Sequence, residues 1–250
     1  MIHVGTSGWQ YADWKGGAFY PQGLPQREWL AFYAARFSTV EVNNSFYRLP
    51  EGDTFERWCH ETPDGFVVTV KASRFITHLK RLRDPEEPIE LFWERANRLG
   101  PRLGPVLFQL PPRFPSDPDR LSRFLAVLPA RMHAAFEFRD PSWHEPAVFD
   151  LLEGAGAALV WADRPGARID LPITSGWAYL RFHQGRPHAA GYTRAKLRRW
   201  ADRIAELHVD EGWIYFNNDP GAAAPRDATE MRALLGERGV RTADPPPDRR

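Results

Sequence analysis

The chain has almost none of the residues that would crosslink it or bind a metal through thiolates. It contains one cysteine, Cys59, so neither an intramolecular disulfide nor a cysteine metal site can form. Positive and negative side chains are nearly equal, at 33 and 32, and the formal net charge is +1. A chain so close to neutrality has no general field that attracts a polyanion or an anionic membrane. Charge-driven binding therefore requires a local cluster of residues.

Long apolar runs are also missing. A membrane-spanning helix needs about 20 consecutive apolar residues, and charges or prolines interrupt every run well before that length. The chain opens directly on Ile2-His3-Val4 with no charged leader or cleavage site, so we expect a soluble cytoplasmic protein without a membrane partner. Lysine is scarce, with four residues against 29 arginines, which makes the position of each lysine informative.

What the sequence does contain is an alternation of short β-type runs with longer helical periods, which is typical of a parallel sheet. Eight strands are predicted, at Ile2–Thr6, Thr39–Asn43, Phe66–Lys71, Pro105–Gln109, His133–Phe138, Ala157–Trp161, Ala178–Phe182 and Trp213–Asn217. Helical periods are clearest at Arg27–Phe37, Ile89–Leu99, Asp119–Leu128, Pro146–Glu153, Arg194–His208 and Ala228–Arg238. The stretch from Asp163 to Trp177 is rich in Pro and Gly, so the crossover between strands six and seven is expected to be irregular.

Eight strands with intervening helices in about 250 residues match a single closed (β/α)₈ barrel of the TIM type. An open doubly wound sheet is the alternative, but no Gly-x-Gly-x-x-Gly motif follows a predicted strand. No linker divides the chain, so residues 1–240 are predicted to form one domain. Residues 241–250, which include three consecutive prolines, are predicted to be a disordered tail.

Side chains along a barrel strand alternate between the lumen and the helix layer, so the pattern predicts which residues point inward. In Thr39-Val40-Glu41-Val42-Asn43 the valines suit the helix side, which turns Glu41 and Asn43 inward. The same reasoning on the other strands predicts inward polar or aromatic side chains at Lys71, Gln109, Glu137, Arg139, Trp161, Asp163, Arg181, His183 and Asn217. These residues lie at the carboxyl ends of the strands, where barrel enzymes hold their active sites.

Opposite charges are balanced in this inward set. The acids are Glu41, Glu137 and Asp163, and the bases are Lys71, Arg139 and Arg181. A network of structural salt bridges is the simpler interpretation, but burying a charge costs several kcal/mol unless it is paired. A ring of charges that converges on one mouth of the barrel therefore favours a ligand site.

Several motifs occur in order along nearly the whole chain, from Val4 to about Leu235. They are Gly5-Thr6-Ser7-Gly8-Trp9, Glu41-Val42-Asn43-Asn44-Ser45-Phe46-Tyr47-Arg48, Val70-Lys71, Gln109-Leu110-Pro111-Pro112, Glu137-Phe138-Arg139, Arg181-Phe182-His183 and Tyr215-Phe216-Asn217-Asn218. In these motifs the sequence resembles the YecE-like family, whose name records a domain of unknown function. The resemblance implies a TIM-barrel-like fold and a bacterial or archaeal cytoplasmic setting, and it implies no reaction.

We predict an enzyme that acts on a small polar or anionic molecule, sugar-like or nucleotide-like, by acid–base chemistry. The candidate catalytic residues are Glu41, Glu137, Asp163 and His183. The candidate binding residues are Lys71, Arg139 and Arg181 for the anion, Asn43, Gln109 and Asn217 to orient it, and Trp9 and Tyr47 to stack on it. The reaction stays open between hydrolysis, isomerisation and elimination.

Other chemistries fit the same residues less simply. Lys71 could form a Schiff base with a carbonyl substrate, although a salt bridge to Glu41 or Glu137 would explain it more simply. No cofactor is predicted, since the interleaved cations argue against a divalent metal on the acids and His183. The mouth could serve a binding protein without catalysis. A nucleic-acid-processing enzyme is a further alternative, but acids are intermixed in the basic segment 194–203, so nucleic acid is not expected as a partner.

Overall fold

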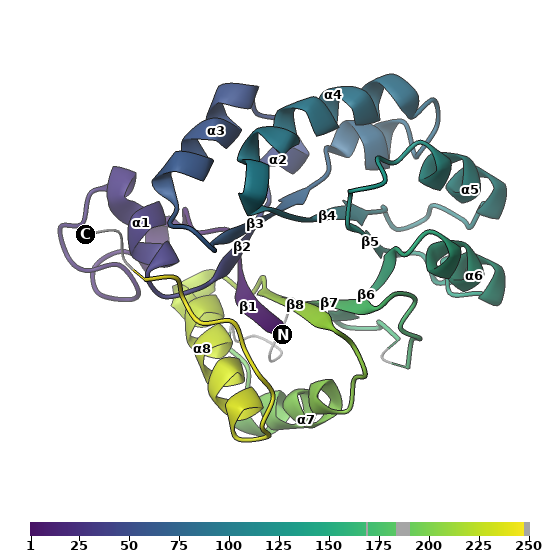
Figure 1. The fold of residues 1–250 in the computed structure, drawn as a ribbon. Helices are drawn as coiled ribbons and strands as arrows, with labels where there is room; N and C mark the ends of the chain where they lie inside the picture. The colour runs from purple at the N-terminus through teal and green to yellow at the C-terminus, as the bar shows by residue number, and fades with distance from the viewer. Residues whose placement is uncertain (169, 184–190, 248–250) are drawn as a thin grey trace.

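The chain closes into a barrel of eight parallel strands in sequence order, with the helices outside it (Figure 1). The computed structural model describes residues 1–168, 170–183 and 191–247. The strands are β1 (Ile2–Ser7), β2 (Thr39–Val42), β3 (Val67–Lys71), β4 (Leu103–Gln109), β5 (Ala134–Glu137), β6 (Ala158–Asp163), β7 (Trp177–Phe182) and β8 (Glu211–Phe216). The predicted (β/α)₈ barrel is confirmed.

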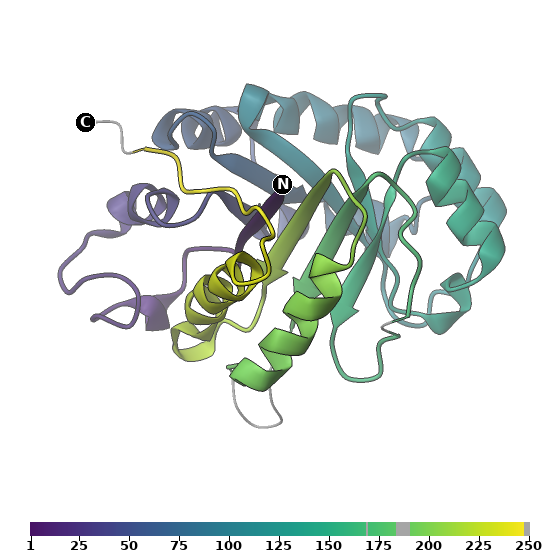
Figure 2. The same ribbon diagram turned by 60° about the horizontal axis from the view of Figure 1, so that its bottom comes forward.

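Helices connect the strands on the outside of the barrel. They are α1 (Trp29–Ala34), α2 (Asn44–Tyr47), α3 (Gly52–Glu61), α4 (Glu86–Ala96), α5 (Pro118–Ala126), α6 (Pro146–Gly154), α7 (Arg194–Ala205) and α8 (Ala223–Gly236). Figure 2 shows α7 and α8 packed side by side. Between β6 and β7 the described residues form turns and extended chain rather than a helix, which agrees with the predicted irregular crossover. Within the described ranges, no helix has the length and apolar character needed to cross a membrane.

Alternation along the strands divides the apolar side chains into two cores. The valines of β2 pack in the layer between strands and helices. A smaller cluster fills the lumen, with Leu107, Ala135, Ala158, Val160, Trp177, Tyr179, Trp213 and Tyr215. In the middle of the barrel, the Tyr215 hydroxyl shares hydrogen bonds of 2.7 Å with the hydroxyls of Thr39 and Thr69. The lumen is thus a packed interior below the carboxyl ends of the strands.

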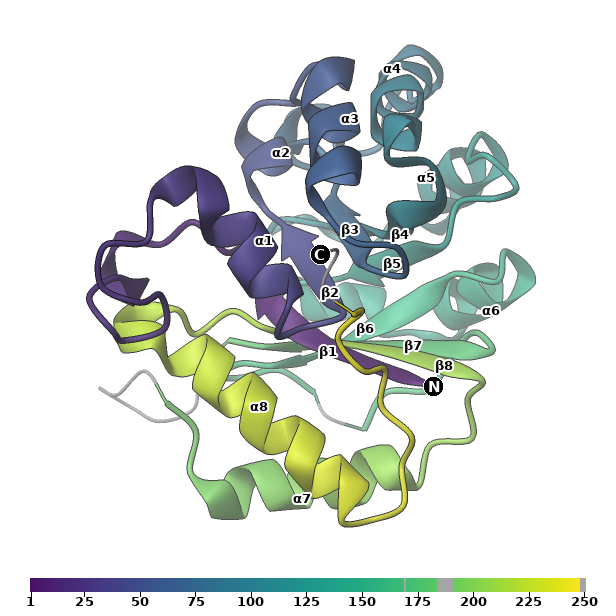
Figure 3. The same cartoon turned by 60° about the vertical axis from the view of Figure 1, so that its left-hand side comes forward.

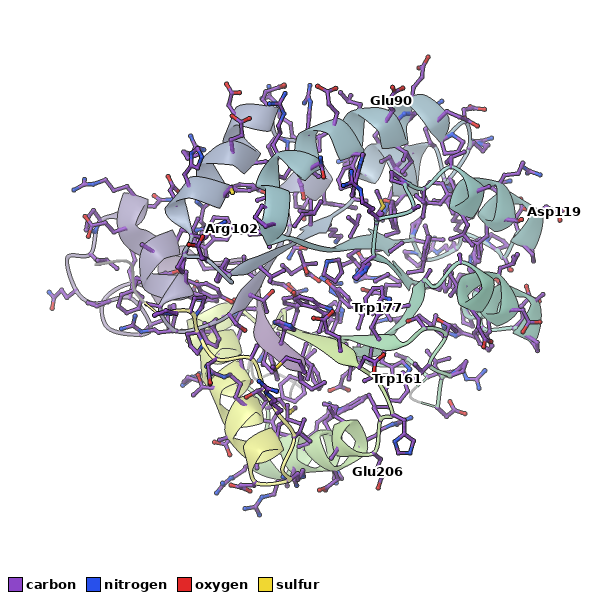
Figure 4. All side chains as sticks on the ribbon, viewed as in Figure 1. Glu90, Arg102, Asp119, Trp161, Trp177 and Glu206 are labelled. Carbon is purple, nitrogen blue, oxygen red and sulfur yellow. The ribbon has the colours of Figure 1, made fainter. Side chains whose placement is uncertain are left out.

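Strand β6 faces the opposite way from the prediction. The sequence predicts inward side chains at Trp161 and Asp163, but the Trp161 ring packs in the core beneath the helices, 4.6 Å from the Arg203 guanidinium of α7. Figure 4 shows Trp161 toward α7 and Trp177 near the centre of the barrel. Residues 158–162 are all apolar, so polarity could not decide their orientation. We attribute the orientation to size, because the large indole is accommodated between β6 and α7.

After α8 the chain runs back beside β1 (Figure 3). The backbone N–H of Ile2 donates to Arg241 O at 2.9 Å, and the N–H of Ala243 donates to Ile2 O at 2.8 Å. Pro246 is also buried. The predicted tail therefore begins with residues that are hydrogen-bonded to the barrel, while its last three residues lie outside the described part of the chain.

Candidate functional site

At the carboxyl end of the barrel, one arginine lies between two carboxylates. Arg181 of β7 donates from Nη2 to Glu41 Oε1 at 2.7 Å and from Nε to Glu41 Oε2 at 3.0 Å. Its Nη1 donates to Glu137 Oε2 at 2.6 Å. The Tyr179 hydroxyl donates to Glu41 Oε2 at 2.5 Å. The side chains of the arginine and both glutamates are at most 1% exposed, so this is a fully buried ionic cluster.

Arg181 determines the protonation of both carboxyls. Burial alone raises the pKa of Glu41, but the charge and hydrogen bonds of Arg181 outweigh burial and hold that pKa below its usual value. At Glu137 burial is opposed by Arg181, His183 and Arg139, and the pKa falls well below its usual value. Both groups are therefore carboxylates at neutral pH. They are poor proton donors, which favours an electrostatic role for them over the predicted proton exchange.

Lys71 lies at the end of β3 and points into the same region. Its Nζ donates to Gln109 Oε1 at 2.9 Å, and Gln109 Nε2 donates to Glu137 Oε2 at 2.9 Å. Because a carboxylate only accepts hydrogen bonds, the amino group of Gln109 must face Glu137 and its carbonyl must face Lys71. Nζ also lies 4.1 Å from the centroid of the Phe46 ring. Burial lowers the pKa of Lys71 to about 8, and Arg181 adds to the lowering.

Two further arginines give the rim of the site an excess of positive charge. Arg139 donates from Nε to Glu137 Oε1 at 3.1 Å, and a third of its side chain stays exposed. Arg164 follows β6 and lies within electrostatic reach of Glu137 and Arg139. Its Nε is buried, and no residue in the described part of the chain forms a hydrogen bond with it. With Lys71 and Arg181, four cationic side chains thus surround two carboxylates.

Two histidines border the site, and both are neutral at pH 7. His183 Nδ1 accepts a hydrogen bond from Asn217 Nδ2 at 3.1 Å, which with the amide in this orientation leaves the ring proton on Nε2. Burial and the charge of Arg181 lower the pKa of His183 to about 4. The pKa of His78 is also lowered to about 4, by burial and then by the neighbouring lysine and arginines. Both shifts thus reflect burial first and the neighbouring positive charges second.

Asp163 and Trp9 do not join this cluster. Asp163 Oδ2 lies 2.7 Å from Lys196 Nζ of α7, on the outer side of β6. The Trp9 ring is only 4% exposed and packs edge-on against Trp58 in the core under the loops. The predicted balance of three acids and three bases is therefore wrong in this respect, because Asp163 leaves the set and Arg164 enters it.

Asn43 and Tyr47 lie beside the mouth rather than in the cluster. Both line a hollow of about 240 Å³ that they share with Trp9, Tyr11 and Asn44, so the two predicted stacking residues, Trp9 and Tyr47, border the same hollow. Tyr47 is 73% exposed, and Asn43 Oδ1 is buried with no hydrogen-bond partner in the ranges that the structure describes. An exposed ring next to an unpaired amide oxygen can contact a polar ring-shaped ligand. Across the ranges that are described, no three His, Cys, Asp or Glu side chains are grouped so as to hold a metal.

Sequence reasoning missed Asp219 in the loop after β8. One of its carboxylate oxygens, Oδ1, is buried, and none of the described residues forms a hydrogen bond with it. Burial raises the pKa of Asp219 to about 7, and Asp13 and Glu41 add to the rise while Tyr11 and Arg181 oppose it. Only the folding of the loops after β1 and β8 against each other shows this, since Trp14 Nε1 donates to the Asp219 carbonyl at 3.0 Å. Arg164 was missed because it also lies in a loop, where no periodicity indicates the direction of a side chain.

Replacement of Asp219 by Asn is expected to stabilise the protein more at high pH than at low pH. Because the folded pKa of about 7 lies above the ordinary value of 3.8, the wild type loses stability as the pH rises from about 4 to about 7. We expect the free energy of unfolding of Asp219→Asn to exceed that of the wild type by up to about 4 kcal/mol at pH 8, at about 1.4 kcal/mol per pKa unit. Little difference is expected at pH 4. Denaturant unfolding at both pH values measures this.

The matched control is Asp150→Asn, which alters an exposed carboxyl on α6. Its unfolding free energy should follow the wild type at both pH values. An Asp219→Asn effect that does not grow with pH would contradict the assignment of a raised pKa.

Comparison with known proteins gives consistent matches over the chain. The family model described as "Protein of unknown function DUF72" matches residues 3–250. UPF0759 protein YunF of Bacillus subtilis (strain 168) is 27% identical, with 94% of this chain and 95% of that protein covered. UPF0759 protein YecE of Escherichia coli (strain K12) is 31% identical over 57% of this chain and 50% of that protein. The crystal structure of a DUF72 family protein from Thermotoga maritima MSB8 superposes with a TM-score of 0.83 and 29% identity, over 94% of this chain and 99% of that one.

Proposed function

Because this chain belongs to the DUF72 family of proteins of unknown function, which includes its YecE-like relatives, we propose its function from the site itself. The protein is an enzyme that binds a small anionic molecule, sugar-like or nucleotide-like, at the carboxyl end of the barrel and acts on it by acid–base chemistry. The observation that carries the proposal is the excess of cationic side chains there, where four face two carboxylates.

The anion is held by the arginines at the rim. Arg139 uses only its Nε on Glu137, so its two terminal nitrogens can bind a carboxylate or phosphate as a fork. Arg164 contributes a buried Nε that has no hydrogen-bond partner among the described residues. A buried donor without a partner costs about 1–3 kcal/mol, and a ligand oxygen would relieve that cost. All three nitrogens of the buried Arg181 already donate to Glu41 or Glu137, so its role is to organise the site.

Proton transfer is assigned to Lys71 and His183, because one is protonated and the other is neutral at pH 7. With a pKa of about 8, Lys71 is largely protonated at pH 7 and can donate. His183, with a pKa of about 4, is neutral there and can accept a proton at Nδ1 when the Asn217 amide moves away from that nitrogen. Burial and Arg181 lower both pKa values, from 10.5 to about 8 for Lys71 and from 6.5 to about 4 for His183, and Glu41 and Glu137 oppose both shifts. The difference between the two groups is therefore the ordinary difference between an amine and an imidazole. A pure binding protein would need no such pair.

The proposal predicts selective binding of anions that depends on Arg139. Wild-type protein is titrated calorimetrically with ribose 5-phosphate and with ribose, and separately with inorganic phosphate. We expect the phosphorylated sugar to bind and the neutral sugar not to bind. Arg139→Met should weaken ribose 5-phosphate binding about 10- to 100-fold, because a charge-assisted hydrogen bond contributes about 1.5–3 kcal/mol.

Arg131→Met is the control, because Arg131 is exposed and precedes β5, at the opposite end of the barrel. Its affinity should equal that of the wild type. Equal binding of ribose and ribose 5-phosphate, or equal losses in Arg131→Met and Arg139→Met, would overturn the proposed anion site.

A further inference from the structure

Lys71 is the buried cation of the site that lacks an acidic partner. Both carboxylates that could pair with it are bound by Arg181, and Gln109 stands between Lys71 and Glu137. Within the described residues, no carboxylate oxygen lies within the 4.0 Å of an ion pair from Lys71 Nζ. A lysine kept for stability would pair with an acid, because an unpaired buried charge is costly. The simple salt-bridge explanation for Lys71 therefore fails.

The contacts around Nζ position it for attack on a substrate rather than for a structural role. The carbonyl of Gln109 accepts one hydrogen from Nζ at 2.9 Å, and the Phe46 ring lies 4.1 Å away. The residue is 8% exposed, so the amine is largely dehydrated but still reachable. Its backbone carbonyl is fixed by the Ser45 hydroxyl at 2.7 Å. The backbone that carries the side chain is thus held in place.

We propose that Lys71 is a nucleophile that forms an imine with a small aldehyde or ketone carrying a phosphate or carboxylate. The nitrogen lone pair attacks the carbonyl carbon, the carbonyl π electrons move to oxygen, and a proton passes from nitrogen to that oxygen. The carbinolamine then takes up a proton and loses water as the C–N double bond forms. No electrons are gained or lost in these steps. The inference rests on the proposed function, because the arginines that bind the anion would place the carbonyl beside Lys71.

The protonation state supports this geometry. With its pKa lowered to about 8, Lys71 is neutral in roughly one molecule in ten at pH 7, against roughly one in three thousand at the ordinary value of 10.5. Burial, Arg181 and Arg139 lower the pKa, while Glu41 and Glu137 oppose them. Only the neutral amine can attack a carbonyl carbon, so the lowered pKa increases the reactive fraction of Lys71.

Borohydride reduction tests the inference, since it converts an imine into a stable secondary amine. Wild-type protein is incubated with ribose 5-phosphate or pyruvate, reduced, digested and mapped by mass. The chain has only four lysines, so Lys15, Lys80 and Lys196 serve as internal controls. We expect one saturable adduct at Lys71 that inorganic phosphate suppresses at least tenfold, and no such adduct with acetone. Lys71→Arg, which keeps the charge, should abolish it.

Two outcomes overturn the inference, and both can be told apart from failure of the proposed function. An adduct spread over the other lysines and the N-terminus, or one that persists unchanged in Lys71→Arg, excludes Lys71 as the nucleophile. If ribose 5-phosphate binds calorimetrically and no adduct forms at Lys71, the anion site stands and the imine is excluded. If calorimetry detects no binding of ribose 5-phosphate, the proposed function itself is wrong. Mapping of the wild type decides the matter even if Lys71→Arg does not fold.

Discussion

Arg181→Met is expected to destabilise the protein by about 3–5 kcal/mol at pH 7, because it leaves two buried carboxylates without their shared partner. Methionine preserves much of the volume, so the loss comes from charge rather than from a cavity. In the wild type, Arg181 keeps the folded pKa values of Glu41 and Glu137 below the ordinary 4.5, and these groups contribute stability above that pH. Without Arg181, burial raises the pKa of Glu41 against its remaining hydrogen bonds, and it raises that of Glu137 against Arg139, His183 and Gln109.

The sign of the pH dependence follows from this change. In the variant, ionisation of Glu41 and Glu137 opposes folding as the pH rises above about 4.5, so its deficit relative to the wild type should be greatest at pH 7 and above. The deficit should shrink as the pH falls toward 4, where the carboxyls are protonated. Denaturant unfolding at pH 4 and pH 7 measures it.

Neutralising the acids provides the matched control. In the Arg181→Met background, Glu41→Gln together with Glu137→Gln removes both buried negative charges and should recover about half or more of the lost stability at pH 7. The same two changes in the wild-type background should destabilise, because Arg181 is then the unpaired charge. If the two glutamines are equally harmful in both backgrounds, the three residues do not act as one buried ionic cluster.

Gly5→Ala is expected to be as damaging, for a purely steric reason. A Cβ at Gly5 would lie 2.2 Å from the backbone oxygen of Thr39 and 3.1 Å from the Tyr33 hydroxyl. The same hydroxyl donates to Thr39 O at 3.0 Å and accepts from the Thr6 N–H at 2.9 Å, so β1, β2 and α1 would all have to move. Since a backbone oxygen cannot rotate away, we expect a loss of about 3 kcal/mol or more in the free energy of unfolding.

Gly212 offers a close comparison on the other neighbour of β1. A Cβ there would meet Ile2 Cδ1 at 2.6 Å, which is the far end of a flexible side chain. Gly212→Ala should therefore cost about 1 kcal/mol or less after Ile2 changes rotamer. Thermal and denaturant unfolding compare the two variants. Equal losses would show that replacing glycine in a strand, rather than the contact with Thr39 O, sets the effect.

Much of the fold follows from local sequence. The alternation of β-type runs with helical periods predicts all eight strands, and the lack of amphipathic period before Trp177 predicts the irregular crossover. In β2 the valines mark the helix side, and the inward direction of Glu41 follows. In each case one face of the element is polar and the other apolar, so burial selects a single orientation.

Other features depend on neighbours that are distant in the chain. Strand β6 has no polar face over residues 158–162, and the sequence predicts an inward Asp163 that in fact pairs with Lys196 of α7. Arg164 and Asp219 occur in connecting loops, where no periodicity indicates direction. Their surroundings are set by loops that meet only when the barrel closes.

The sequence by itself determined the closed barrel and the kinds of polar side chain that gather at one end of it, because alternation and hydrophobicity act locally. Only the tertiary structure decided which of those charges pair. Arg181 binds Glu41, 140 residues away, and Glu137, 44 residues away. Lys71 therefore donates to the uncharged amide of Gln109 instead of to a carboxylate. Electrostatic energy depends on the distance between charges in space and on their burial, and neither quantity follows from the order of the residues.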